Sequence, residues 1–125
     1  MEITPLLPED RQIIQSYGIG RFKVSQIAYE GSIIVLPSKT LPWGVKALED
    51  IGFQNLDPVL KEDPAVDILL IGCGKSMQLL PRVFLERWRE QGTAVDAMDT
   101  GAACRTYNIL SAEGRRVAAA VIALD

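Results

Sequence analysis

A glycine-rich segment that carries one lysine is the first feature of the chain that could do chemistry: Gly72-Cys73-Gly74-Lys75-Ser76. Glycines let backbone N–H groups approach an anion, and the lysine adds positive charge. Nucleotide-binding P-loops also end in Gly-Lys-Ser, but they need a glycine five residues before Gly74, where this chain has Leu69. The segment therefore fits a small-anion site or a tight strand-to-helix turn with a solvated lysine, and it does not fit nucleotide hydrolysis.

A second polar group lies between a predicted strand and a predicted helix. Asp99 or Thr100 can cap that helix through a side-chain oxygen, and Asp99 also suits the positive end of the helix dipole. The alternative is a binding loop in which both side chains hydrogen-bond a ligand. Arg105 points away from the apolar stripe of the helix, so it is a solvated arginine, an anion contact or an anchor in a protein interface. Asn108 is a mediocre helix former, so we expect a hydrogen bond to hold it.

The two cysteines, Cys73 and Cys104, are expected to be free thiols in a reducing compartment. Cys104 would lie in the first turn of the helix, where the helix N-terminus can lower a thiol pKa, so a redox pair with Cys73 is one hypothesis. Burial is the alternative, because Cys104 borders the apolar stripe of Ala103, Tyr107 and Leu110. The sequence has no histidine, which removes Ser-His and Cys-His pairs and most zinc sites, so we expect neither a metal nor a cofactor.

Size and charge limit the class of protein. With 125 residues, of which 48% are hydrophobic, the chain is expected to form one soluble domain over residues 1–125. Its 13 basic and 16 acidic residues give a net charge of -3, which argues against broad nucleic-acid binding. The longest apolar stretch, residues 117–124, is too short to span a bilayer, so no membrane insertion is expected. Glu2 follows Met1 without a basic start or an apolar run, which favours a cytoplasmic protein without a signal peptide.

The first part of the chain is predicted to be β-structure. Residues 22–29 and 32–36 flank Glu30-Gly31, which suits a hairpin turn. The second of these runs is almost continuously apolar, which predicts a strand buried on both faces. Further on, residues 45–51 fit either a short helix or a strand. Asp57 followed by a proline predicts an N-cap and a short helix over residues 58–62.

The second half of the chain alternates strands with helices. Apolar runs predict strands over residues 67–71, 93–98 and 115–124, and amphipathic patterns predict helices over 78–91 and 101–112. This order predicts right-handed crossovers and an α/β fold: a single compact domain with a central mixed, partly parallel β-sheet, helices packed on it and an N-terminal antiparallel β segment. The C-terminal ends of strands 67–71 and 93–98 then form a crevice where ligands usually bind. The predicted ligand or partner site at this crevice comprises Gly72, Cys73, Gly74, Lys75, Ser76, Asp99, Thr100, Cys104, Arg105 and Asn108.

Two runs near the C-terminus are similar to the signature of a known family. Residues 98–110 are Met-Asp-Thr-Gly-Ala-Ala-Cys-Arg-Thr-Tyr-Asn-Ile-Leu, and residues 113–120 are Glu-Gly-Arg-Arg-Val-Ala-Ala-Ala. On these runs the chain resembles, over nearly its whole length, a small single-domain family of unknown function that includes the mitochondrial respiratory complex I assembly factor 3. Weaker support comes from Tyr17-Gly18, Gly31-Ser32-Ile33, Leu36-Pro37, Trp43 and Leu70-Ile71-Gly72-Cys73-Gly74.

The resemblance implies a compact α/β fold with a central mixed sheet and no known enzyme activity. The mitochondrial member works through protein partners, and the family offers no catalytic residues to carry over. The glycine loop departs from the family pattern, which usually has threonine where this chain has Cys73. The chain also lacks a transit-like N-terminus, which favours a bacterial type of protein.

Three classes of function follow from these features. The leading hypothesis is a non-enzymatic protein-binding or assembly-type factor, because the chain has no histidine and no nucleophile–base pair. The alternative is a small-molecule or anion-binding enzyme that uses the crevice, with Lys75 and Arg105 holding an anion and Asp99 as the obvious acid–base candidate. A thiol-redox protein is the third class, and it needs the Cα atoms of Cys73 and Cys104 within about 7 Å.

Overall fold

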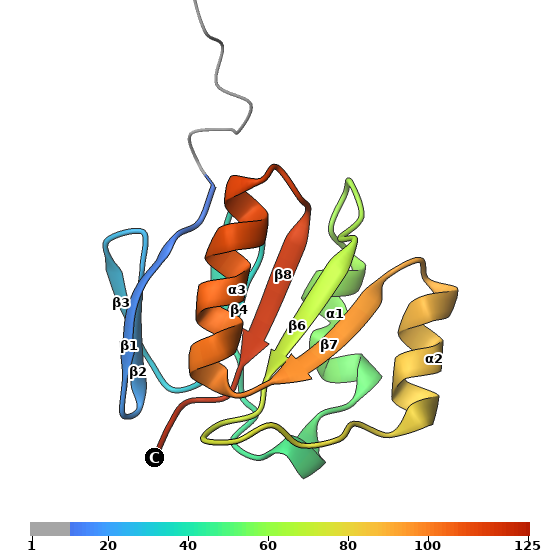
Figure 1. The fold of residues 1–125 in the computed structure, drawn as a ribbon, viewed down its shortest axis with the longest axis horizontal. Coiled ribbons are helices and arrows are strands. Elements are labelled where there is room, and N and C mark those ends of the chain that lie inside the picture. Colours follow the sequence, from blue (N-terminus) through green and yellow to red (C-terminus); the bar gives the residue numbers. More distant parts are fainter. Residues whose placement is uncertain (1–10) are drawn as a thin grey trace, which may run out of the picture.

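The computed structural model describes residues 11–125, which form two β-sheets with helices packed against the larger one (Figure 1). The smaller sheet has the strand order β1-β2-β3, and the larger has the order β5-β4-β8-β6-β7. The strands are β1 (Ile14–Gly18), β2 (Arg21–Val24), β3 (Ile27–Glu30), β4 (Ile33–Val35), β5 (Thr40–Pro42), β6 (Ile68–Gly72), β7 (Ala94–Met98) and β8 (Val117–Val121). The helices are α1 (Asp57–Leu60), α2 (Arg82–Glu90) and α3 (Thr100–Ala112), with 3-10 turns η1 (Leu48–Asp50) and η2 (Phe53–Leu56).

The larger sheet is mixed, as its sequence pattern predicts. Strand β6 pairs in parallel with β7 and β8, while β4 pairs antiparallel with β8 and β5. The parallel arrangement of the predicted strands 67–71 and 93–98 is therefore confirmed. Strands β4 and β8 are buried along their whole length, which confirms the prediction that residues 32–36 are covered on both faces.

The smaller sheet contains a hairpin that the sequence pattern does not predict. Ser25 (φ 47°) and Gln26 (φ 74°) both have left-handed backbone and connect β2 to β3, as in a two-residue type I′ turn. The hairpin predicted around Glu30-Gly31 is therefore wrong, because residues 22–29 already fold back on themselves. Gly31 (φ 82°) instead leads the chain from β3 to β4 in the other sheet. Serine and glutamine are not usual in this turn, so the sequence gives no sign of it.

The two long helices start where their capping residues dictate. Helix α2 begins at Arg82, later than predicted, because Pro81 is its N-cap and a proline disfavours helical backbone in the residue before it. Helix α3 begins at Thr100, and Asp99 Oδ1 accepts a hydrogen bond from the Ala102 N–H at 2.8 Å, which confirms the predicted cap. Among residues 11–125, no helix has the length and apolar character needed to cross a bilayer.

The middle segment forms short helical turns. Within residues 45–51, the turn η1 covers Leu48–Asp50. Helix α1 has Leu56 as its N-cap, so the predicted cap at Asp57 is wrong: the chain runs directly from η2 into α1, and Asp57 already has helical backbone. The Asp57 carboxylate instead forms an ion pair with the Lys61 ammonium group at 2.8 Å, one helical turn further along the chain.

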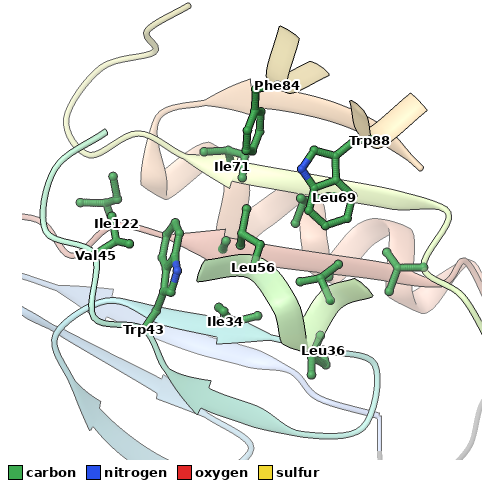
Figure 2. Packing of buried hydrophobic residues seen from close by; sticks show 14 of the residues in the cluster. Ile34, Leu36, Trp43, Val45, Leu56, Leu69, Ile71, Phe84, Trp88 and Ile122 are labelled. Carbon is green, nitrogen blue, oxygen red and sulfur yellow. The ribbon is translucent and has the colours of Figure 1, made fainter. Parts of the chain in front are cut away.

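Apolar side chains cover both faces of the larger sheet. On the face towards α1 and α2, Trp43 and Trp88 lie in one buried cluster with Leu69 (Figure 2). On the face towards α3 and the smaller sheet, Phe22 and Tyr107 belong to a second cluster. The Tyr107 hydroxyl donates to the Leu36 carbonyl at 2.8 Å, as expected for a buried tyrosine. The sheet is therefore held between two layers, and its C-terminal edge positions the candidate residues.

Candidate functional site

Hydrogen bonds join the two loops that follow β6 and β7. The Cys73 N–H donates to the Met98 carbonyl at 2.8 Å, so the ends of the two strands meet as predicted. The Thr100 N–H donates to the Gly74 carbonyl at 2.8 Å, and the Gly74 N–H donates to Thr100 Oγ1 at 2.9 Å. Since these bonds connect the loops directly, protein contacts occupy the expected crevice at these residues.

Thr100 and Gly72 close the end of the sheet. Thr100 is fully buried, and its hydroxyl also donates to the Ile122 carbonyl at 2.7 Å. A Cβ atom at Gly72 would lie 2.8 Å from Val121 Cγ1 and 3.1 Å from Thr100 Cα, so only glycine lets α3 approach β6 this closely. Both residues therefore join α3 to the sheet.

Three further candidate residues lie along α3. Asp99 caps the helix, and Asn108 pairs with the backbone of Ile14 in β1: its Oδ1 accepts from the Ile14 N–H at 2.9 Å and its Nδ2 donates to the Ile14 carbonyl at 2.8 Å. The hydrogen bond expected for Asn108 is thus confirmed. Arg105 is exposed, and its Nη1 donates to the Tyr17 hydroxyl at 2.7 Å. Arg105 and Asn108 therefore face the smaller sheet.

The exposed part of the glycine loop lines a separate pocket. Lys75 and Ser76 are exposed and contribute to a pocket of about 240 Å³ that Lys46 and Glu49 also line. Arg105 is not among its lining residues. The structure thus divides the predicted site in two, with Cys73–Ser76 on this pocket and Arg105 and Asn108 towards β1.

The two cysteines lie on opposite faces of the larger sheet. Cys73 belongs to the cluster beneath α1 and α2, and Cys104 to the cluster beneath α3, and both are buried free thiols. Burial raises the pKa of the Cys104 thiol to about 12; Arg105 lowers it less, and Asp99 raises it slightly. The expected burial of Cys104 is therefore confirmed, and the hypothesis of a lowered thiol pKa is wrong, because desolvation outweighs the helix N-terminus. No three His, Cys, Asp or Glu side chains of residues 11–125 are grouped so that they could hold a metal ion.

An apolar surface that the sequence reasoning missed lies beside the glycine loop. Met77, Leu79 and Val83 are 55%, 87% and 69% exposed, and we call these three residues the 77–83 surface. They adjoin a pocket of about 270 Å³ whose apolar lining includes Leu79 itself, Leu48 and Phe84. A signal was present in the sequence, since Leu79 and Val83 are apolar residues that lie outside the apolar stripe of Phe84 and Trp88 on the predicted helix 78–91.

The comparisons with known proteins agree with this fold. A family model described as a protein of unknown function (DUF498/DUF598) matches residues 14–122. The NADH dehydrogenase (ubiquinone) 1 alpha subcomplex assembly factor 3 of Danio rerio is 34% identical over 110 residues. That match covers 88% of this chain but 63% of the relative, so the chain spans less than two thirds of that protein's length.

Solved structures match at similar levels of identity. An outer membrane protein from Bartonella henselae superposes with a TM-score of 0.84 and 35% identity, covering 92% of this chain and 97% of that one. A Bordetella pertussis protein described as a Mth938-like domain superposes with a TM-score of 0.80 and 28% identity, covering 98% of this chain and 92% of that one. Their α/β fold is the fold described above.

Proposed function

The chain belongs to the DUF498/DUF598 family of proteins of unknown function, and from this membership we propose that it is a non-enzymatic protein-binding factor of the assembly type. Similarity to a named assembly factor supports the proposal. Fold and family do not fix function, which depends on the surface of this chain.

The observation that carries the proposal is the 77–83 surface. Apolar side chains gathered on one exposed loop and the start of a helix are typical of a surface that another protein covers. The adjoining pocket is large enough to receive an apolar side chain of a partner, which is how interfaces anchor their strongest contacts.

The polar candidate residues support binding over catalysis. Thr100 and Asn108 use their side-chain hydrogen bonds on the backbone of the chain itself, and Asp99 uses Oδ1 to cap α3. The sequence has no histidine, and Cys104 is buried with a raised pKa. These contacts leave few of the candidate side chains free to act on a ligand by acid–base or nucleophilic chemistry.

Capture of partners from native cells under mild conditions tests the proposal. We expect the tagged chain to retain a specific protein, and we expect the double variant Leu79→Gln, Val83→Gln to lose it. Ile109→Gln is the matched control, because Ile109 is 59% exposed on α3, on the other face of the sheet. If the unchanged chain retains no specific protein, the proposal is wrong.

A small anion is the second candidate ligand, because Lys46 and Lys75 line the same pocket, together with Glu49 and Asp125. A thermal-shift screen against anions, nucleotides and common metabolites tests it, with Lys75→Ala and Arg105→Ala run in parallel. A ligand at about 100 times its dissociation constant should add roughly 2.7 kcal/mol of stability. Loss of that gain in Lys75→Ala alone would place the anion in the pocket, and the absence of any gain would remove this candidate.

A cytoplasmic location and a bacterial origin stay predictions. We also expect no nucleic-acid partner, since the net charge is -3. Fractionation of cells that produce the full protein at its natural level checks the location. Recovery with the membrane fraction after a high-salt wash would contradict it.

A further inference from the structure

Strand β7 is an open edge of the larger sheet. It pairs with β6 only. The Ala94 N–H donates to Asp67, and the Met98 carbonyl accepts from Cys73, so every second residue of β7 directs its backbone towards β6. The backbone N–H and C=O groups of Val95 and Ala97 therefore point outward, and no strand in residues 11–125 pairs with them.

A groove lies at the start of this edge. Helix α2 lies beside β7 (Figure 1), and the two elements line a pocket of about 380 Å³. Leu85 and Arg89 line it from the helix, and Ala94 and Val95 line it from the strand, with Thr93 just before it. A groove between a helix and an open strand edge is the geometry in which an extended peptide adds to a sheet, since the strand supplies hydrogen bonds and the helix supplies side-chain contacts.

Two other strand edges are protected. Strand β5 has three residues and ends in Pro42, and proline cannot donate to a further strand. At the edge of β1, the side chain of Asn108 takes both backbone groups of Ile14. Proteins use protection of this kind to prevent unwanted pairing. Strands β7 and β3 both lack it, and of these two edges β7 is the one with a helix beside it (Figure 1).

Charges in the groove indicate the partner. Arg89 lines the groove, and Arg82, seven residues earlier on α2, lies on the same face of the helix outside the groove lining. Glu86 lies beside them, so this face carries two positive charges and one negative charge. Both arginines are exposed, and neither takes part in the ion pair found within residues 11–125, which joins Lys61 to Asp57. We propose that an extended segment of a partner protein adds to β7 as a sixth strand, with acidic and apolar side chains directed towards α2. The inference rests on the proposed function, because the segment belongs to the protein partner.

A second copy of the chain fits this edge less well. Antiparallel pairing of two β7 strands with full overlap would place Asp96 directly opposite Asp96 of the other copy. Like charges in that position destabilise a pair of strands. In a partner segment, lysine or arginine can lie opposite Asp96 while acidic residues alternate towards Arg89.

The test uses peptides displayed on phage, selected at random on the full chain and then synthesised with a fluorescent label. We expect selected peptides to carry acidic and apolar residues at every second position, with a lysine or arginine between them to lie opposite Asp96. We also expect them to slow hydrogen exchange of the Val95 and Ala97 amides. Ala97→Pro removes an outward N–H and should weaken binding by about tenfold or more, the value of one to two net hydrogen bonds. Arg89→Glu should weaken it similarly without altering the backbone.

Matched controls come from the smaller sheet. Because Val24 and Ile27 flank a two-residue turn and exchange hydrogen bonds, the backbone of Ala28 also points outward, at the open edge of β3. Ala28→Pro and Arg21→Glu should leave peptide binding unchanged. Equal binding by Ala97→Pro and the unchanged chain, or no selected peptide, would overturn the inference, as would a dimer in sedimentation that Ala97→Pro dissociates.

The same variant separates this inference from the proposed function. If Ala97→Pro still retains the partner captured from cells, the edge is not the docking site but the protein-binding function stands. If peptides bind the edge while the unchanged chain captures nothing from cells, the edge inference stands and the assembly-type function is wrong.

Discussion

Asn108 in α3 makes both hydrogen bonds that a neighbouring strand would make to Ile14 in β1. Its amide oxygen accepts from the Ile14 N–H at 2.9 Å, and its amide nitrogen donates to the Ile14 carbonyl at 2.8 Å. This contact joins residues 94 positions apart and attaches the smaller sheet to the helix that covers the larger one. An asparagine that is unfavourable for the helix thereby becomes a link between the two sheets.

Replacement Asn108→Ala should destabilise the protein by about 1–3 kcal/mol, because it leaves two backbone groups of Ile14 without partners. Urea unfolding measures this loss, and hydrogen exchange at the Ile14 amide should accelerate. Ile109→Ala, at the neighbouring exposed position, should stay within about 0.5 kcal/mol of the unchanged chain. Equal stability of the two variants would show that the amide does not hold β1.

Replacement Thr100→Val keeps the shape of the side chain and removes its hydroxyl. The Gly74 N–H and the Ile122 carbonyl both lose a partner at the end of the sheet, so we expect a loss of about 2–4 kcal/mol. Thr100→Ser retains the hydroxyl and should lose only about 1 kcal/mol, for the missing methyl group. In thermal unfolding, Thr100→Ser should therefore have a higher Tm than Thr100→Val. A higher Tm for Thr100→Val would contradict the role of the hydroxyl.

Replacement Gly72→Ala should destabilise the protein by about 1–3 kcal/mol, because the added methyl group overlaps Val121 and the backbone of Thr100. Gly44→Ala is the control, since a Cβ atom there meets nothing within 4 Å. Chemical denaturation of both variants measures the difference. Similar midpoints would mean that the end of the sheet relaxes without cost.

Stability should fall at high pH because of two buried groups. Burial raises the pKa of the Cys104 thiol from 9.0 to about 12 and also raises the pKa of the Tyr107 hydroxyl. As the pH rises, both groups lose their protons in the unfolded chain at a lower pH than in the folded protein. The unfolded state therefore binds fewer protons at alkaline pH. The free energy of unfolding should then decrease from about pH 9 upward, by at most about 1.4 kcal/mol per pH unit for each group.

Denaturation at a series of pH values checks this decrease, and Cys104→Ala should make it shallower. A thiol reagent gives a second measurement: at about pH 8 the Cys104 thiol stays protonated and should react only after unfolding. Rapid reaction of both cysteines in the folded protein would contradict the burial argument.

Local signals were enough to predict α3 and the order of strands and helices around it. Asp99 caps the helix through contacts within three residues, and the apolar runs of β6 and β8 identify buried strands wherever they are placed. Where the local signal was weak, as at Ser25 and Gln26, the prediction was wrong: the turn is held by the pairing of β2 with β3 and not by the usual turn residues.

The arrangement of the candidate residues depends instead on contacts between distant parts of the chain. Topology correctly brings the ends of β6 and β7 together. Nothing in the spacing of Gly74 and Thr100 shows that the two bond to each other, because a hydrogen bond across 26 residues requires the folded sheet and helix to be in position. For the same reason, the open edge at β7 is known only once all its neighbours are placed. Composition and periodicity thus determine the elements and their order, while long-range packing determines which polar groups are occupied and which stay free to bind.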